Sequence, residues 1–114
     1  MLVTMKEILD RASTGNYAVI APNVFCEIDT RAANAAAEKL NSPIIIDLSV
    51  GSTKDIVVTG RNLVDIAKQT AVPVAVNLDH GGDVHKSFDE VTEEIMQAIT
   101  AGFTSVMVDR SSLP

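Results

Sequence analysis

A short apolar segment, residues 74–78, runs directly into an acid, an imidazole and two glycines. Its valines and the preceding proline favour a buried β-strand, because the segment is too short for a helix. Asp79 and His80 therefore follow the carboxyl end of a strand, where chemistry collects in parallel α/β sheets. Gly81 and Gly82 let the backbone turn sharply or approach a ligand there. Side chains of these two types suit proton transfer and metal binding, but they also serve as hydrogen-bonding groups that only stabilise a loop.

The elements that must position this pair alternate along the chain. Helices are expected at residues 4–14, 28–40 and 60–71, and a fourth between a cap at Ser87 and a stop at Gly102. Strands are expected at residues 17–21, 44–46, 74–78 and 104–108. An N-terminal helix followed by alternating strands and helices predicts an α/β fold with a parallel sheet and right-handed crossovers.

Local signals support several of these elements. Thr4 with Glu7 forms a possible capping box, and Gly15 is placed to end the first helix in a left-handed conformation. Residues 44–46 are all isoleucine, which predicts a strand buried on both faces. The second helix is expected to pack through one face, formed by Ile28, Ala32, Ala35, Ala36 and Leu40.

About four strands and three crossover helices amount to half of a TIM (β/α)8 barrel, which typically needs eight strands and about 250 residues. Residues 1–114 are therefore expected to form one incomplete domain with two open sheet edges. We expect a piece of a longer barrel, or a homo-oligomer that completes the sheet with other chains. A four-stranded α/β sandwich that stands alone is the alternative.

Composition excludes several classes of partner. The chain has 46% hydrophobic residues, a net charge of −6 and a pI near 4.7, whereas nucleic acids and anionic membranes require basic patches. Its single cysteine, Cys26, rules out an internal disulfide and fits a reducing compartment. Since there is also no apolar run of about 20 residues, a cytoplasmic protein is expected.

The segment Leu78-Asp-His-Gly81 resembles the strand end that carries the metal site in class II, metal-dependent fructose- and tagatose-bisphosphate aldolases. The likeness extends over nearly the whole chain, in the family's order. The matching segments are residues 1–9, 17–19, 41–44, 78–81, 101–107 and 112–114.

The resemblance implies roles for individual residues. His80 matches a histidine that binds the catalytic zinc, and Asp79 matches the aspartate that donates and accepts the proton at the aldehyde oxygen. Asn23 and Ser49 match positions that line the substrate pocket, and Asp109 matches an aspartate near the metal and substrate region, so all three are expected to bind substrate. The implied reaction is reversible cleavage of a ketose bisphosphate to dihydroxyacetone phosphate and an aldehyde, in carbohydrate metabolism such as glycolysis. The partner would be a small sugar phosphate.

The zinc site is expected to be incomplete within these residues. A catalytic zinc takes three protein ligands and keeps one open position, and the chain has only one other histidine, His85. In the family, the remaining histidine ligands come from the second half of the barrel. Nothing in the spacing of His85 and Cys26 requires them to bind the same ion as His80. Because ligands are missing, the isolated chain is expected to lack appreciable activity.

The resemblance has two departures. The family usually carries Asp-Gly-Ser-His-Leu-Pro after the fourth strand, where this chain has Arg110 and Ser112 in place of the glycine and the histidine. Arginine adopts glycine-like backbone angles less readily, and it would either bind a phosphate or lie on the surface. Near Asn23, Pro22 and Cys26 also differ from the family pattern and alter that rim.

Two other functions fit the same sequence. The first is a non-catalytic half-barrel module that assembles with copies of itself through its open edges. The second is a related barrel lyase or isomerase that uses the same strand-end acid and metal. Light scattering distinguishes the first from the aldolase, and assays across sugar phosphates distinguish the second.

Overall fold

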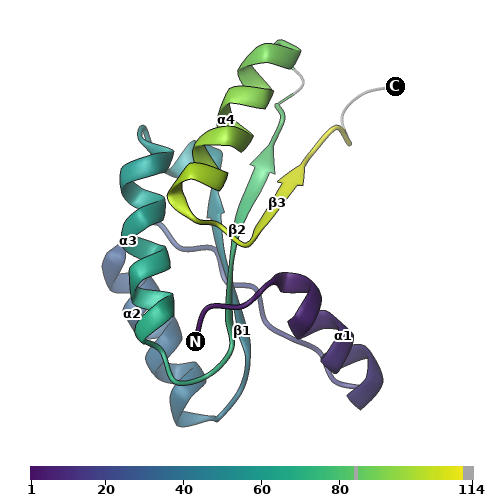
Figure 1. The fold of residues 1–114 in the computed structure, drawn as a ribbon, viewed down its shortest axis with the longest axis vertical. Helices are drawn as coiled ribbons and strands as arrows, with labels where there is room; N and C mark the ends of the chain where they lie inside the picture. Colours follow the sequence, from purple (N-terminus) through teal and green to yellow (C-terminus); the bar gives the residue numbers. More distant parts are fainter. Residues whose placement is uncertain (84, 112–114) are drawn as a thin grey trace.

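The chain folds around a three-stranded parallel sheet in the order β1-β2-β3 (Figure 1). The computed structural model describes residues 1–83 and 85–111. Its elements are α1 (Met5–Gly15), α2 (Glu27–Lys39), β1 (Ile44–Ser49), the short 3₁₀ helix η1 (Val50–Ser52), α3 (Ile56–Gln69), β2 (Val74–Gly81), α4 (Phe88–Ala101) and β3 (Ser105–Val108). The predicted α/β class with parallel strands is confirmed.

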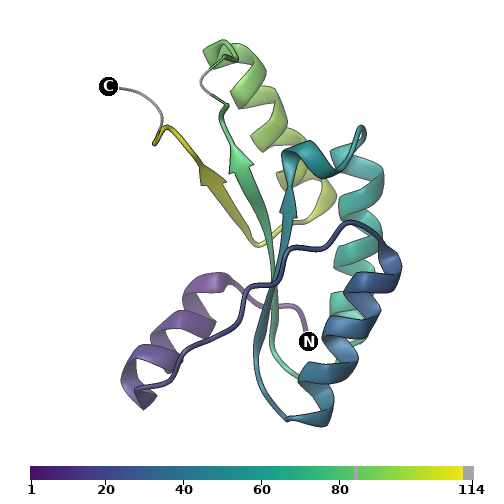
Figure 2. The ribbon, with the colours of Figure 1, turned by 180° about the vertical axis from the view of Figure 1, so that it is seen from behind.

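Successive side chains of the strands point to opposite faces of the sheet. Helices α2, α3 and α4 lie on one side and α1 on the other, as Figures 1 and 2 show from opposite directions. The helix-covered face is the main core and receives Ile44, Ile46, Leu48, Val74, Val76 and Leu78. The second face, called here the open face, carries Ile45, Asp47, Ser49, Ala75, Asn77 and Asp79.

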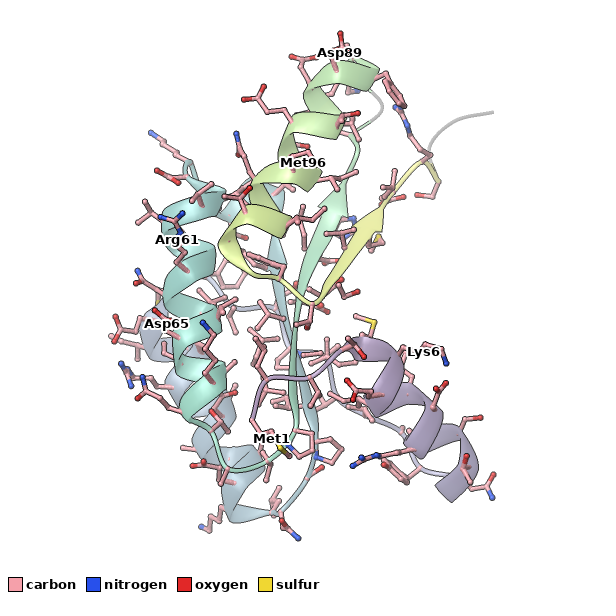
Figure 3. The ribbon with its side chains drawn as sticks, viewed as in Figure 1. Met1, Lys6, Arg61, Asp65, Asp89 and Met96 are labelled. Carbon is pink, nitrogen blue, oxygen red and sulfur yellow. The ribbon has the colours of Figure 1, made fainter. Side chains whose placement is uncertain are left out.

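Helix α1 covers only the amino-terminal end of the open face. Ile8 packs there on Ile45 and Ala75, and all three are buried, which confirms that the isoleucine run is buried on both faces. Lys6 points outward from α1 and pairs with Asp10 (Figure 3). The carboxyl-terminal half of the open face carries polar side chains instead.

The central strand β2 has different neighbours along its length. Near its start, Leu2 forms a parallel bridge with Val74, and the Val3 amide donates to the Val74 carbonyl at 2.9 Å. Met1, labelled in Figure 3, begins this segment. Farther along, β3 pairs with the same edge of β2, where Ser105 lies opposite Asn77. The N-terminal segment therefore supports the sheet where β3 does not reach.

The predicted strand at residues 17–21 is wrong as a regular strand. The chain does run beside β1, because the Ile45 amide donates to the Ile20 carbonyl and the Asp47 amide to the Pro22 carbonyl, both at 3.1 Å. The ladder would next require an N–H at position 22, which proline lacks. Only the isolated bridge between Asn23 and Asp47 remains in this segment, so the sheet formed by residues 1–83 and 85–111 has three regular strands instead of four.

The rotation of α2 also differs from the prediction. Ile28 and Leu40 are 76% and 75% exposed, and the helix instead buries Thr30, Asn34 and Ala37. The reason is a polar contact between helices: the Asn34 side-chain amide donates to Thr70 Oγ1 at 2.9 Å. A buried amide needs such a partner, so hydrogen bonding overrides the apolar periodicity.

The ends of the other helices show which local signals were reliable. The capping boxes at Thr4 and Ser87 are confirmed, as is the left-handed Gly102 at the end of α4. The left-handed residue that terminates α1 is Asn16 (φ 53°), one position after the predicted Gly15. Helix α3 begins earlier than the predicted residue 60, because the Asp55 side chain caps it by accepting from the Val58 amide at 2.8 Å.

Candidate active site

Polar side chains gather where β1 and β2 end. In the parallel register Ser49 lies opposite Asp79, so both belong to the last row of the open face. Asp79 is only 8% exposed and Ser49 is half-buried. The predicted position of Asp79 at the carboxyl rim of the central strand is therefore observed, with β2 continuing through Gly81.

A β-bulge changes the direction of the His80 side chain. The pairing of β2 with β3 shifts between Leu78 and Gly81, and His80 has a left-handed backbone with φ 54°. A side chain at Gly81 would meet the Met107 carbonyl oxygen at 2.7 Å, and Gly82 has φ 88°. The two glycines thus allow β3 to approach closely while the chain turns, which leaves the His80 side chain 59% exposed.

The His80 ring lies between two carboxylates. Its Nδ1 is 2.8 Å from Asp109 Oδ2, and its Nε2 is 3.6 Å from Asp79 Oδ2. The hydrogen bond with Asp109 and the nearby charge of Asp79 raise the pKa of His80 above its ordinary value. The site therefore joins the acid and imidazole of one strand to the acid that follows the next.

Asp109 is fixed by the residues that follow it. Ser111 donates to Asp109 Oδ1 from its hydroxyl at 2.6 Å and its backbone amide at 2.9 Å, which leaves Oδ2 for His80. These bonds, the Ser111 hydroxyl first, lower the pKa of Asp109 to about 2. Arg110 does not adopt a positive φ, and its guanidinium lies 3.4 Å from the Asp83 carbonyl, to which it donates. Ser112 lies outside the described residues.

A second row of polar residues crosses the open face one step below Asp79. Asn23, Asp47, Asn77 and Ser105 are consecutive partners across the sheet; we call them the polar row. The Asn77 side-chain amide donates to Asp47 Oδ1 at 2.9 Å. Burial raises the pKa of Asp47, and the nearby Asp79 charge acts in the same direction.

Sequence reasoning missed Asp47 and Asn77, although a signal was present. Each interrupts an otherwise apolar strand, and Asn77 lies two residues before Asp79, which puts it on the same face. Asn23, by contrast, was predicted, and it joins the polar row from the segment beside β1, where it is exposed.

The other candidate ligands do not join His80. Over residues 1–83 and 85–111, no group of three or more His, Cys, Asp and Glu side chains is arranged to hold a metal ion. The His85 side chain is exposed in the loop after β2, where its amide donates to Asp83 Oδ1, and the exposed Cys26 precedes α2. His80 offers one metal-binding nitrogen, Nε2, while Nδ1 faces Asp109.

A hollow of about 350 Å³ lies at the opposite end of the sheet, between α1 and the starts of β1 and β2. Its lining includes Ile8, Tyr17, Pro43 and Pro73. The amino-terminal ends of parallel strands rarely carry catalytic groups, so we place the site at the carboxyl rim instead.

No helix within the described ranges has the length and apolar character needed to cross a membrane.

Comparison with known proteins identifies the group to which the chain is related. A family model described as "Fructose-bisphosphate aldolase class-II" matches residues 3–114. The chain belongs to this family. The resemblance predicted from the sequence is thereby confirmed.

Curated relatives cover nearly all of this chain. A fructose-bisphosphate aldolase from Thermus caldophilus is 42% identical over 115 residues, 97% of this chain and 34% of the relative. One from Geobacillus stearothermophilus is 42% identical over 119 residues, 99% of this chain and 38% of the relative. A 6-phospho-5-dehydro-2-deoxy-D-gluconate aldolase from Halalkalibacterium halodurans is 37% identical, with coverage of 99% and 38%. The chain thus spans well under half the length of these relatives.

Solved structures agree with this assignment. The YdjI aldolase from Escherichia coli K12 superposes with a TM-score of 0.83 and 29% identity, over all of this chain and 41% of that one. A fructose-bisphosphate aldolase from Campylobacter jejuni shares the fold, with a TM-score of 0.78 and 24% identity over 98% of this chain and 39% of that one. The predicted parallel α/β sheet of an aldolase TIM barrel is therefore confirmed, with three regular strands among the described residues where about four were expected.

Proposed function

We propose that this chain supplies part of the active site of a metal-dependent aldolase that reversibly cleaves a ketose bisphosphate to dihydroxyacetone phosphate and an aldehyde. The observation that carries the proposal is the arrangement of Asp79 and His80 at the carboxyl rim, with Asp109 on the far side of the imidazole. A relative in Halalkalibacterium halodurans is named for a different substrate, a phosphorylated sugar acid.

Asp79 is proposed as the proton donor and acceptor. Carbon–carbon bond formation leaves negative charge on the former aldehyde oxygen, and an adjacent acid must protonate it; in the cleavage direction the same carboxylate removes that proton. Asp79 suits this role because it is nearly buried yet ends a row that faces the open side of the sheet. Because Asp79 belongs to strand β2, its carboxylate is held more precisely than it would be on a loop.

His80 is proposed as a zinc ligand through Nε2. A ligating imidazole usually donates its other nitrogen to a carboxylate, which fixes the ring and its tautomer, and Asp109 is 2.8 Å from Nδ1. This donor set fits a divalent metal, which, when bound, would polarise the substrate ketone and stabilise the enediolate. The site needs further ligands, so we propose that residues 1–114 alone have no appreciable turnover.

Asn23, Ser49 and Asp109 are proposed to contact the substrate. Asn23 and Ser49 supply neutral hydrogen-bonding groups on the open face, at the polar row and at the last row respectively. The partner is proposed to be a small sugar phosphate, and the working compartment the reducing cytoplasm, in keeping with the single free Cys26.

A chimera tests the proposal. The matching segment of the Geobacillus stearothermophilus aldolase, 42% identical over 119 residues, is replaced by this chain. We expect the purified chimera to cleave fructose or tagatose bisphosphate with zinc. Asp79→Ala should lower kcat by about 10²–10⁴, the usual contribution of a positioned acid–base group. Asp83→Asn, in the exposed loop beyond the strand, serves as the control. A folded chimera whose turnover is unaffected by Asp79→Ala would refute the assignment.

A second candidate function is self-assembly through the sheet edges. It is favoured by the outer strand β3, whose Val106, Met107 and Val108 are 37%, 37% and 49% exposed. Such an apolar edge promotes pairing with another chain. Light scattering of the 114-residue chain with and without zinc tests this candidate: a stable monomer counts against it, and a defined homo-oligomer supports it.

A further inference from the structure

The polar row contains a buried polar contact that the roles proposed above do not use. Asn77 is 5% exposed and donates its side-chain N–H to Asp47, yet its own Oδ1 is buried without a hydrogen-bond partner among the described residues. Leaving a buried acceptor unsatisfied destabilises a fold. The strand could avoid this with an apolar residue, as it does one row lower, where Ala75 pairs with Ile45.

Asn77 therefore has a positional role. Its N–H fixes Asp47 Oδ1, while Asp47 Oδ2 accepts no hydrogen bond within the described part of the chain. Asp47 is half-buried and lies on the open face one row beyond Ile45, on which α1 packs; a contact of α1 with the polar row is that of Met5 Sδ, 3.7 Å from Ser105 Oγ. The carboxylate is thus held in one orientation, with one oxygen available to a ligand that rests on the open face.

The chemistry of the row decides which part of a ligand it accepts. Asp47 Oδ2 is an acceptor on the open face, and Asp79 adds a second carboxylate one row above, whereas Asn77 Oδ1 is itself buried. This surface attracts hydrogen-bond donors and repels phosphate. On a sugar phosphate, the groups that donate are the hydroxyls of the carbon chain.

We propose that Asp47 contacts the substrate by accepting a hydrogen bond from a hydroxyl of its carbon chain, with Asn77 as the positioning residue. This inference rests on the proposed aldolase function and adds to it a specificity-determining pair. It directs the hydroxyl-bearing carbons toward the polar row and the phosphate groups away from it.

Two ligands that differ only in hydroxyls test the inference. Glycerol 3-phosphate and n-propyl phosphate share a three-carbon chain and a phosphate, and only the first carries free hydroxyls. Each is titrated into the ¹⁵N-labelled 114-residue chain, and dissociation constants are read from the shifts of His80 and of the Asn77 side-chain amide. We expect tighter binding of glycerol 3-phosphate, with a shift at Asn77 for that ligand alone.

Variants then separate the contact from the fold. Asp47→Ala should raise the Kd of glycerol 3-phosphate about tenfold and leave the Kd of propyl phosphate unchanged, the effect of losing one charge-assisted hydrogen bond. Asp47→Asn keeps an acceptor for Asn77 and should give a smaller loss. Asn77→Leu should also reduce the preference for glycerol 3-phosphate. The matched reporter is Asn34, another buried asparagine with an unpartnered Oδ1, which lies between α2 and α3 and should not shift.

The possible outcomes distinguish failure of this inference from failure of the proposed function. Equal affinity for the two ligands, or an equal loss for both in Asp47→Ala, overturns the inference; if His80 still shifts, the proposed function survives. If neither phosphate shifts Asn77 or His80 at its solubility limit, the inference fails, and the chimera decides the proposed function independently. A preference for glycerol 3-phosphate that depends on Asp47 supports both.

Discussion

His80 Nδ1 lies 2.8 Å from Asp109 Oδ2, across the bulge that separates the ends of β2 and β3. The two residues are 29 positions apart in the chain, and the contact exists because adjacent parallel strands end at the same rim. Ser111 holds the other oxygen of the same carboxylate, so the imidazole has a fixed partner.

Asp109→Asn should lower the pKa of His80, because the substitution removes the largest cause of its upward shift. The folded-state pKa of His80 is above its ordinary value of 6.5, so its protonation favours the folded state. This contribution is fully present below pH 6.5 and is lost as the pH rises through the folded pKa. An NMR titration of the His80 ring measures the shift. Asp83→Asn is the control, and an unchanged His80 pKa in Asp109→Asn would contradict the assigned hydrogen bond.

Ser111→Ala should raise the pKa of Asp109 from about 2 toward its ordinary 3.8, because it removes the hydroxyl donor and keeps the backbone one. Since the folded pKa is depressed, the stabilising contribution of Asp109 is present above pH 3.8 and is lost as the pH falls through about 2. The titration is followed by carboxyl ¹³C NMR. Ser13→Ala, at an exposed position of α1, should leave the Asp109 titration as it is.

Zinc should perturb one of the two histidines. If His80 is a ligand and His85 is a solvated loop residue, zinc should shift or broaden the ring signals of His80 first. His80→Ala should then abolish the high-affinity part of the response, whereas His85→Ala should keep it. The affinity should fall as the pH drops through the raised pKa of His80, because a protonated imidazole cannot bind the ion. Equal responses of the two rings would show that zinc binds without using the rim.

Much of the fold was predictable because the signals are local. The capping boxes at Thr4 and Ser87, the isoleucine run at residues 44–46 and Gly102 each act through neighbouring residues. What failed depended on contacts distant in sequence. Pro22 interrupts a ladder with β1, and the rotation of α2 follows from Asn34 bonding to Thr70, 36 residues away.

For the candidate site too, local signals in the sequence indicated some residues, whereas other features depend on contacts distant in sequence. Asp79 and His80 were found from their place after an apolar strand, and the family resemblance added Asn23, Ser49 and Asp109. Nothing in the sequence indicated that a bulge would turn His80 toward Asp109, because this depends on how closely β3 packs on Gly81. Asp47 was also missed: it interrupts an apolar strand, but its pairing with Asn77 of another strand is not visible in the sequence.

Gly60 tests the packing that places α3 beneath the sheet. A Cβ at this position would overlap Phe103 Cε2 and lie 2.9 Å from Ala101 Cβ, at the point where α4 leads into β3. Alanine has a higher helix propensity than glycine by about 1 kcal/mol, but overpacking a buried site typically destabilises by about 1–3 kcal/mol. Phe103 is buried and a rigid ring cannot yield easily, so we expect Gly60→Ala to lower the free energy of unfolding.

The matched substitution is Gly51→Ala in η1, where the nearest atom to a new Cβ is Ser49 Oγ at 4.0 Å. It should change the unfolding free energy by no more than about 0.5 kcal/mol, as is usual for open surface positions. Urea titrations followed by circular dichroism compare the two variants. If Gly60→Ala proves as stable as Gly51→Ala, Phe103 is not wedged against α3, and the close approach of α4 to α3 needs another explanation.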